Sequence, residues 1–200
     1  MILRPESALN ALWAIWYVSW IAAAYWSART TVQMKTDMGG WHRIASGFGA
    51  ILLFWPHRVV NWAPGGGFFR FAFDRLWPST VASGWVLFAL AALGFAFCWW
   101  ARLHLGKLWS GFVTLKEDHR IVDTGPYGLV RHPIYSGVMF AAVATASMRA
   151  SPAAFAGAAL IILGFSMTAR IEEGFLRARL RPDAYDGYRR RVGMLLPRLG

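Results

Sequence analysis

The chain has 200 residues, of which 56% are hydrophobic and only 16% are charged, and its formal net charge is +11. A typical soluble domain carries about 45–50% apolar and about 25% charged residues. The high hydrophobicity excludes intrinsic disorder, and the single cysteine, Cys98, excludes a disulfide-stabilised fold. Two classes remain, namely a membrane protein with basic edges and an unusually apolar nucleic-acid-binding protein.

Three predicted membrane spans lie in the amino-terminal half. Residues 8–26 and 81–101 contain no charged residue, and each has the roughly 20 residues that cross a bilayer core as a helix. Residues 44–56 are apolar but short, and they reach spanning length only if the helix continues through His57 and Arg58 towards Ala63. Polar side chains near a helix end can reach the interface, so we predict a span here as well.

Two further spans, residues 134–148 and 153–169, form a predicted helical hairpin. Only four residues separate them, and Pro152 suits the first turn of the returning helix. Both arms are rich in Ala and Gly, which let helices approach closely in lipid. A soluble Ala-rich hairpin is the alternative, but neither arm has the polar periodicity that it requires.

The basic residues are distributed unequally over the two sides of these five spans. With the carboxy terminus in the cytoplasm, 16 of the 21 Lys and Arg residues lie on the cytoplasmic side. This asymmetry follows the positive-inside rule and sets the orientation. Because the charge lies at predicted membrane edges and not along a soluble fold, we expect no nucleic-acid partner. A basic tail beside a bilayer contacts anionic headgroups instead.

Residues 63–79 are not a predicted membrane span. Gly65, Gly66 and Gly67 indicate a turn, and the following segment mixes several phenylalanines with Arg70 and Asp74. This pattern is typical of an amphipathic segment that lies in the membrane interface.

Two polar clusters flank the hairpin, and polar clusters at a membrane edge are candidate functional sites. The first lies within residues 119–137, where Gly125 and the prolines at 126 and 133 indicate turns. Four polar or aromatic residues lie between and beside these turns, namely Tyr127, Arg131, His132 and Tyr135. A loop with a cation, an imidazole and phenols suits a polar ligand that carries a carboxylate. The alternative is a juxtamembrane connector with interfacial side chains.

The second cluster, Arg170, Glu172 and Glu173, stands where the fifth predicted span ends. Adjacent helix positions point about 100° apart, so the two carboxylates do not form a dyad that shares a proton. One of them can accept hydrogen bonds from a ribose diol. The alternative is a solvated helix end, with Glu173 paired to Arg177 one turn later.

Taken together, the two clusters resemble the isoprenylcysteine carboxyl methyltransferase family and the related phospholipid methyltransferases. The resemblance covers roughly residues 109–197 and depends on the following motifs: His119-x-x-Val122-x-x-Gly125-x-Tyr127, Arg131-His132-Pro133-x-Tyr135-x-Gly137, Arg170-x-Glu172-Glu173-x-x-Leu176, Tyr185-x-x-Tyr188 and Pro197. The amino-terminal spans match the family only in hydrophobicity. The Gly-rich fingerprint of soluble Rossmann methyltransferases is absent from the sequence.

The resemblance implies S-adenosylmethionine as the cofactor, bound at the cytoplasmic membrane edge. The cofactor-binding residues that it implies are His119, Ile121, Val122, Tyr127, Arg131, His132, Pro133, Tyr135, Glu172 and Tyr185. Arg170 would lie near the methyl acceptor. An ionised carboxylate acceptor needs no base, whereas an amine acceptor does, and Glu173 or His119 could serve. We predict no metal site.

We therefore expect an all-α, polytopic membrane protein with about five transmembrane helices and a cytoplasmic carboxy-terminal helical tail, in a bacterial inner membrane. Residues 1–105 would hold three spans and the interfacial segment, and residues 106–200 would form the cofactor-binding catalytic region with the hairpin 134–169. The sequence carries no indication of the oligomeric state.

The expected function is S-adenosylmethionine-dependent methyl transfer to a lipophilic small molecule or lipid, with carboxyl O-methylation favoured. N-methylation of a phospholipid and methylation of a small thiol are alternatives within the same class. The alternatives outside the methyltransferase class are a reductase of related architecture, a small transporter and a lipid-binding membrane protein. Five spans with no visible internal repeat argue against a transporter.

Overall fold

The structure is a computed structural model that describes residues 4–26, 30–33, 40–55, 67–110, 114–116, 121–179 and 182–198. In chain order the elements are α1 (Pro5–Ala24), β1 (Thr30–Gln33), α2 (Trp41–Phe54), α3 (Gly67–Phe73), α4 (Val81–Leu105), the 3-10 turn η2 (Gly106–Leu108), β2 (Thr114–Lys116), α5 (Pro126–Leu129), α6 (Pro133–Arg149), α7 (Pro152–Arg179) and α8 (Pro182–Arg191). The expected all-α membrane class is confirmed, with one short antiparallel pairing of β1 and β2 added to it.

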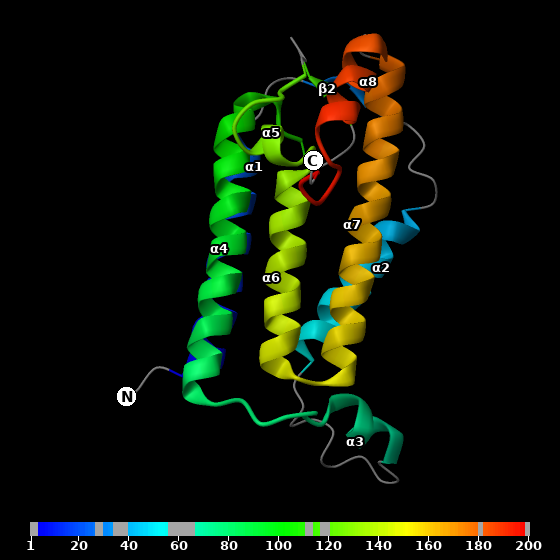
Figure 1. Cartoon of the computed structure of the whole chain (residues 1–200). Helices are drawn as coiled ribbons and strands as arrows, with labels where there is room; N and C mark the ends of the chain where they lie inside the picture. Colours follow the sequence, from blue (N-terminus) through cyan, green and yellow to red (C-terminus); the bar gives the residue numbers. More distant parts are fainter. Residues whose placement is uncertain are drawn as a thin grey trace.

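The long helices lie side by side, with α6 between α4 and α7 (Figure 1). Helix α2 packs along α7, and α1 packs against α4. Because α6 and α7 run in opposite directions, the start of α6 and the end of α7 meet at the same end of the bundle (Figure 1). We call this the site end, and we call the opposite end, where α6 turns into α7, the turn end.

Small residues bring the helices into close contact, as the Ala- and Gly-rich sequence predicts. A Cβ atom on Gly137 of α6 would lie 2.5 Å from the carbonyl oxygen of Gly94 in α4 and 2.5 Å from the Cys98 sulfur. Gly157 of α7 meets the backbone of α2 in the same way at Gly49. These contacts leave no room for larger side chains, so they fix the position of α6 and α7 relative to their neighbours.

Aromatic side chains of α1 fill the space beside α4. The ring of Trp13 stands edge-on to Phe95 at 4.7 Å between centroids, and Trp16 stacks on the same phenylalanine at 4.8 Å. The indole N–H of Trp13 donates to the Thr145 hydroxyl oxygen at 2.9 Å. A buried indole normally finds such a partner, and here it ties α1 to α6.

The hairpin predicted from the sequence is confirmed, and α7 is longer than expected. Helix α6 ends at Arg149, its C-cap Ala150 adopts the left-handed conformation (φ 53°), and Pro152 opens α7. The predicted span ended at residue 169, but α7 continues to Arg179. The Arg170–Glu173 cluster therefore lies within a helix and not at its end.

The second predicted span is corrected. Helix α2 begins at Trp41 and ends at Phe54, and Trp55 leaves the helical conformation with ψ 126°. The expected continuous helix through His57 and Arg58 is therefore wrong. Pro56 explains the break, since a proline disfavours the helical conformation of the residue before it. Residues 56–66 lie outside the described part of the chain.

Among the described residues, α1, α4 together with η2, and α7 are long and apolar enough to cross a membrane. Helices α2 and α6 have 14 and 17 residues, fewer than the roughly 20 that a span requires. An integral membrane protein is therefore confirmed, but the count of five spans is not.

Polar side chains close the turn end. Arg75, after α3, pairs with Glu6 of α1 and donates to the Met148 carbonyl at 3.4 Å. Arg149 donates to the Asn10 amide oxygen at 2.6 Å. These contacts tie the described part of the predicted interfacial segment to α1 and to the hairpin turn.

Candidate functional site

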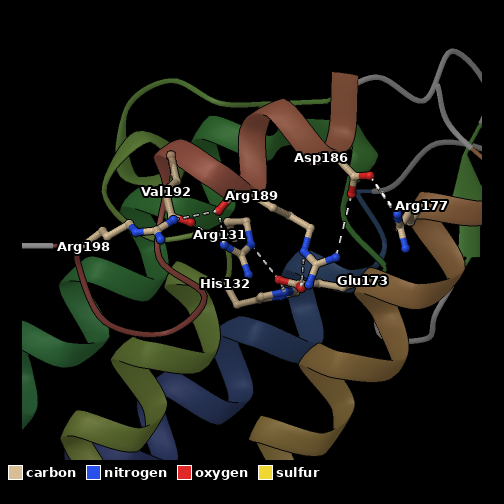
Figure 2. A network of polar contacts seen from close by, with 8 residues as sticks. All are labelled: Arg131, His132, Glu173, Arg177, Asp186, Arg189, Val192 and Arg198. Atoms are coloured by element: carbon tan, nitrogen blue, oxygen red, sulfur yellow. Dashed lines mark hydrogen bonds and ion pairs between the residues drawn. The ribbon is translucent and has the colours of Figure 1, made fainter. Parts of the chain in front are cut away.

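The loop that precedes α6 is shaped by glycine and proline. Gly125 has φ +56°, and a Cβ atom there would lie 2.8 Å from the His104 ring, so a side chain at this position meets both strain and a clash. Pro126 and Pro133 open α5 and α6 at the helix position that tolerates proline. His132, held non-helical before Pro133, turns its side chain towards α7 (Figure 2).

The carboxy-terminal segment after α8 folds back along this loop. Val130 and Gly193 form an isolated parallel bridge. Three hydrogen bonds join the two segments: from the Arg131 N–H to the Gly193 carbonyl (2.8 Å), from the His132 N–H to the Met194 carbonyl (3.1 Å) and from the Ser136 hydroxyl to the Leu195 carbonyl (2.7 Å). The end of the chain is therefore part of the site and not a free tail.

Helix α8 docks through two buried tyrosines. Tyr185 and Tyr188 form a buried cluster with Val192, against which Ile121 and Leu176 pack. The Tyr188 hydroxyl donates to the Tyr127 carbonyl at 2.7 Å. Burial raises the pKa of Tyr127, Tyr185 and Tyr188 well above the ordinary value. All three phenols therefore stay neutral and hold α8 against the loop.

Glu173 is the centre of a charged network at the site end (Figure 2). Its side chain is only 7% exposed, yet three cationic or imidazole groups reach it. The contacts to its carboxylate come from Arg131 Nε (2.6 Å), Arg189 Nε (3.3 Å) and His132 Nε2 (3.3 Å). Since both carboxylate oxygens are engaged, Glu173 joins α7, α8 and the loop before α6.

The same arginines extend the network along α8. Arg131 also donates to the carbonyls of Val192 and Arg189. Arg189 lies 3.8 Å from Asp186, which accepts two hydrogen bonds from Arg177 at 2.8 and 3.2 Å. Figure 2 shows that these groups form one continuous chain of contacts between α7 and α8.

Glu172 stands in a different environment from its neighbour. Its side chain is 31% exposed, and it accepts a hydrogen bond of 2.8 Å from the Tyr135 hydroxyl. His132 Nδ1 lies 3.7 Å from the same carboxylate. The rings of His132 and Tyr135 stack with centroids 5.3 Å apart and planes 4° apart, and Phe165 packs on Tyr135 at 5.1 Å. A half-exposed carboxylate beside stacked rings can accept hydrogen bonds from a polar ligand.

The structure places most of the predicted site residues at the site end, where they form two groups. Arg131, His132, Tyr135 and Glu172 converge, and Pro133 positions them. Tyr185 and Ile121 pack in the α8 cluster, and Val122 is half-buried beside Ile121. Tyr127 is buried and stacks on His104 with centroids 6.4 Å apart. His119 lies outside the described residues.

Arg170 does not join this cluster. It is exposed on α7, and it forms no ion pair with any residue that the structure describes. Helix geometry places it about 160° around α7 from Glu172. The pair of Glu173 with Arg177, which belonged to the alternative of a solvated helix end, is not formed, because Arg177 binds Asp186 and Glu173 binds Arg131.

Sequence reasoning missed two structural arginines at the site end. Arg189 belongs to the carboxy-terminal basic tail, which the sequence assigned as a whole to lipid headgroups. Its contact with Glu173 has no local sequence signal, because the two residues belong to different helices. Arg102 is fully buried in α4 and donates to carbonyls at the end of α1, Ala23 and Trp26, each at 2.7 Å. The rings of Trp26 and Trp109 lie against its guanidinium at 5.1 and 4.7 Å.

Comparison with known proteins supports the same class of protein. Residues 85–176 match the sequence model of the isoprenylcysteine carboxyl methyltransferase (ICMT) family. A search of curated proteins found no match. The fold resembles a solved structure of the eukaryotic intramembrane Ras methyltransferase ICMT, with a TM-score of 0.59 and 19% identity over 98% of this chain and 69% of that one. These findings support the resemblance found in the sequence, and the chain is an integral membrane protein with an ICMT-like helical fold.

Proposed function

We propose that this protein is an S-adenosylmethionine-dependent methyltransferase that esterifies the carboxylate of a lipophilic acceptor. The observation that supports the proposal is the cluster of Glu172, Tyr135 and His132. These three residues lie in the part of the chain that matches the ICMT family model. In this proposal, residues 106–200 form the catalytic region, residues 1–105 form the acceptor side of the bundle, and the site end faces the cytoplasm.

The residues at the site end suit this cofactor chemically. The half-exposed Glu172 carboxylate can accept hydrogen bonds from a ribose diol. The stacked rings of His132 and Tyr135 are largely buried, and the Tyr135 hydroxyl holds the Glu172 carboxylate in place through its hydrogen bond. When bound, S-adenosylmethionine would supply a methyl group on a positively charged sulfonium.

The other residues in this proposal position these groups. Glu173 holds the His132 imidazole by its Nε2 atom, and the carboxy-terminal segment fixes the His132 backbone. Preorganisation of this kind contributes to catalysis because reacting groups must be held in line for transfer. Val122, Tyr127 and Tyr185 would close the site from the side of the loop and α8.

The environment of Glu173 favours a carboxylate acceptor over an amine. An amine acceptor must lose a proton, and a base within reach must take it. Both Glu173 oxygens are already engaged by arginine and histidine, so this carboxylate is poorly placed to serve. A carboxylate acceptor is ionised at neutral pH and needs no base. We assign its orientation to Arg170, as the family resemblance implies; because Arg170 lies about 160° around α7 from Glu172, its guanidinium would have to reach around the helix to bind a carboxylate beside the cofactor.

The product of the reaction tests this proposal. Membranes containing the protein are incubated with methyl-labelled S-adenosylmethionine, and the labelled lipids are then treated with alkali. A carboxyl methyl ester releases labelled methanol, whereas an N-methyl group and a thioether keep the label. Label in the lipid fraction that resists alkali would replace the proposal with N- or S-methylation. No label above a control without the protein would reject methyl transfer.

Arg170→Lys and Arg170→Ala test the role of Arg170. Because Arg170 has no ion pair with the described residues, neither change should affect the fold. We expect Arg170→Ala to raise KM for the acceptor and Arg170→Lys to restore part of the loss, with cofactor binding unchanged. Wild-type kinetics in Arg170→Ala would remove Arg170 from the site.

A further inference from the structure

The end of the chain encloses an open pocket outside the cluster of Glu172, Tyr135 and His132. It has a volume of about 740 Å³ and lies between α8, the loop before α6 and the carboxy-terminal segment. Its charged lining consists of Arg131, Arg189, Arg190, Arg198 and Asp186. Apolar residues complete the lining, and one of them, Leu196, is 78% exposed. We call this the arginine pocket.

The charges in the arginine pocket are not balanced. Arg131 and Arg189 share the Glu173 carboxylate, and Arg189 also approaches Asp186. Arg198 donates to the backbone carbonyl of Arg190 at the end of α8. The Arg190 side chain is exposed and forms no ion pair with any residue described by the structure. Asp186 is the one carboxylate among the lining residues, and it also binds Arg177, so the four guanidinium groups of the lining leave an excess of positive charge in a pocket with an apolar edge.

We propose that the arginine pocket binds the phosphate of an anionic phospholipid headgroup. Guanidinium groups match phosphate oxygens in a bidentate geometry and keep their charge at every physiological pH. A free phosphate ion offers the same oxygens, but it makes no use of Leu196, whereas the glycerol and upper acyl carbons of a lipid would cover this side chain. The pocket also lies at the site end, where α6 begins and the candidate membrane helix α7 ends (Figure 1).

This is a specific site and not the general attraction of a basic tail to a membrane. Arg191 follows Arg190 in the chain, but it does not line the pocket and pairs instead with Asp123 at 3.1 Å. The two arginines have the same charge and lie on the same helix. Arg191→Gln is therefore a matched control for Arg190→Gln. The binding does not depend on the proposed methyl transfer, so each can be tested without the other.

The test uses the full chain, purified in a neutral detergent. The thermal unfolding midpoint is followed during titration with dioctanoyl phosphatidylglycerol, with dioctanoyl phosphatidylcholine and with inorganic phosphate. A ligand that binds only the folded protein stabilises it by RT ln(1 + L/Kd), where L is the free ligand concentration, so the midpoint rises with the ligand concentration relative to Kd. We expect phosphatidylglycerol to raise it and the other two to leave it unchanged at the same concentrations.

The variants locate the effect. Arg190→Gln should weaken the apparent affinity for phosphatidylglycerol about tenfold, the loss expected from one hydrogen-bonded charge. Arg190→Lys should restore part of the affinity, since the charge returns without the bidentate geometry. Arg191→Gln should bind as the wild type does. Among the described residues, the Arg190 side chain has no hydrogen bond or ion pair that its replacement would break, so we expect the variants to fold.

Four outcomes would overturn the proposal. An equal response to phosphatidylcholine would show that the acyl chain alone binds. A response to inorganic phosphate as large as that to the lipid would make this a free-phosphate site. An equal loss in Arg190→Gln and Arg191→Gln would show a diffuse electrostatic effect. Displacement of phosphatidylglycerol by S-adenosylmethionine would assign the pocket to the cofactor.

Discussion

Arginines close both ends of the helical bundle, but their surroundings differ. At the turn end, Arg75 pairs with Glu6, and the two side chains are 27% and 38% exposed. At the site end, Arg131 pairs with Glu173, and the exposed fractions are 9% and 7%. An exposed pair is worth little because water screens it, whereas breaking a buried pair leaves a charge without compensation. The comparison shows that the same pair of residue types fastens a loop at one end and holds the candidate site together at the other.

The largest expected effect follows directly from this difference. Glu173→Ala would leave Arg131, Arg189 and the His132 ring without their common partner, so we expect a loss of about 3–5 kcal/mol in the free energy of unfolding. Glu6→Ala at the turn end should cost about 1 kcal/mol or less. Chemical unfolding in detergent micelles, followed by tryptophan fluorescence, measures both. Equal losses in the two variants would show that burial does not distinguish the two ends.

The second effect tests the close helix contacts that set the position of the site. Gly137→Ala would bring a methyl group against the Cys98 sulfur and the Gly94 carbonyl, so we expect a loss of about 1–3 kcal/mol from overpacking. Gly174→Ala on α7 is the control, because nothing lies within 4 Å of the added atom. This change should be neutral or stabilising, since alanine favours the helix. A neutral Gly137→Ala would mean that α4 and α6 can separate without cost.

A smaller effect concerns the docking of α8. Tyr188→Phe removes the hydrogen bond to the Tyr127 carbonyl, and we expect a loss of about 1 kcal/mol. The raised pKa of Tyr188 has a further consequence. The folded chain keeps the phenolic proton at a pH where the unfolded chain releases it, so this contribution is complete below about pH 10 and declines above it. Stability measured from neutral to alkaline pH should therefore fall less steeply in Tyr188→Phe, and an unchanged slope would contradict the assignment.

The smallest effect is expected at the surface of α8. Arg191→Gln breaks a pair with Asp123 whose side chains are 65% and 44% exposed. We expect a change of about 0–1 kcal/mol that disappears at high salt. Unfolding at low and high salt measures it. A loss as large as that of Glu173→Ala would show that the exposed part of the network supports the site as strongly as the buried part.

Much of this architecture could be predicted from the sequence, because apolar runs and short turn signals are local. The uncharged segments became α1 and α4, and Pro152 correctly marked the start of α7. The error at α2 is also local in origin. The helix was predicted to continue past Trp55 because only hydropathy was considered. Pro56 in the sequence already indicated that the helix ends before it.

The candidate site was predictable only in part. The motifs around His132 and Glu172 placed two clusters at one membrane edge, and the structure brings them into contact. The different surroundings of Glu172 and Glu173 could not be predicted, since they depend on Arg189 of α8 and on the backbone of the carboxy-terminal segment. Arg102 is a similar case. The predicted span ended at residue 101, one residue before Arg102, but α4 continues to Leu105 and the folded chain buries Arg102 against the end of α1.

The measurement that most directly tests the central claim is calorimetric titration of the purified protein with S-adenosylmethionine. We predict that the wild type binds it, that Glu172→Gln weakens binding at least about tenfold, and that Glu6→Gln at the turn end leaves binding unchanged. Glu172→Gln keeps the shape of the side chain, removes its charge and replaces one acceptor oxygen with an NH2 donor, while the remaining oxygen can still accept from the Tyr135 hydroxyl, so a folding defect is not expected. Absence of binding in the wild type, or equal affinity in the wild type and Glu172→Gln, would contradict the account.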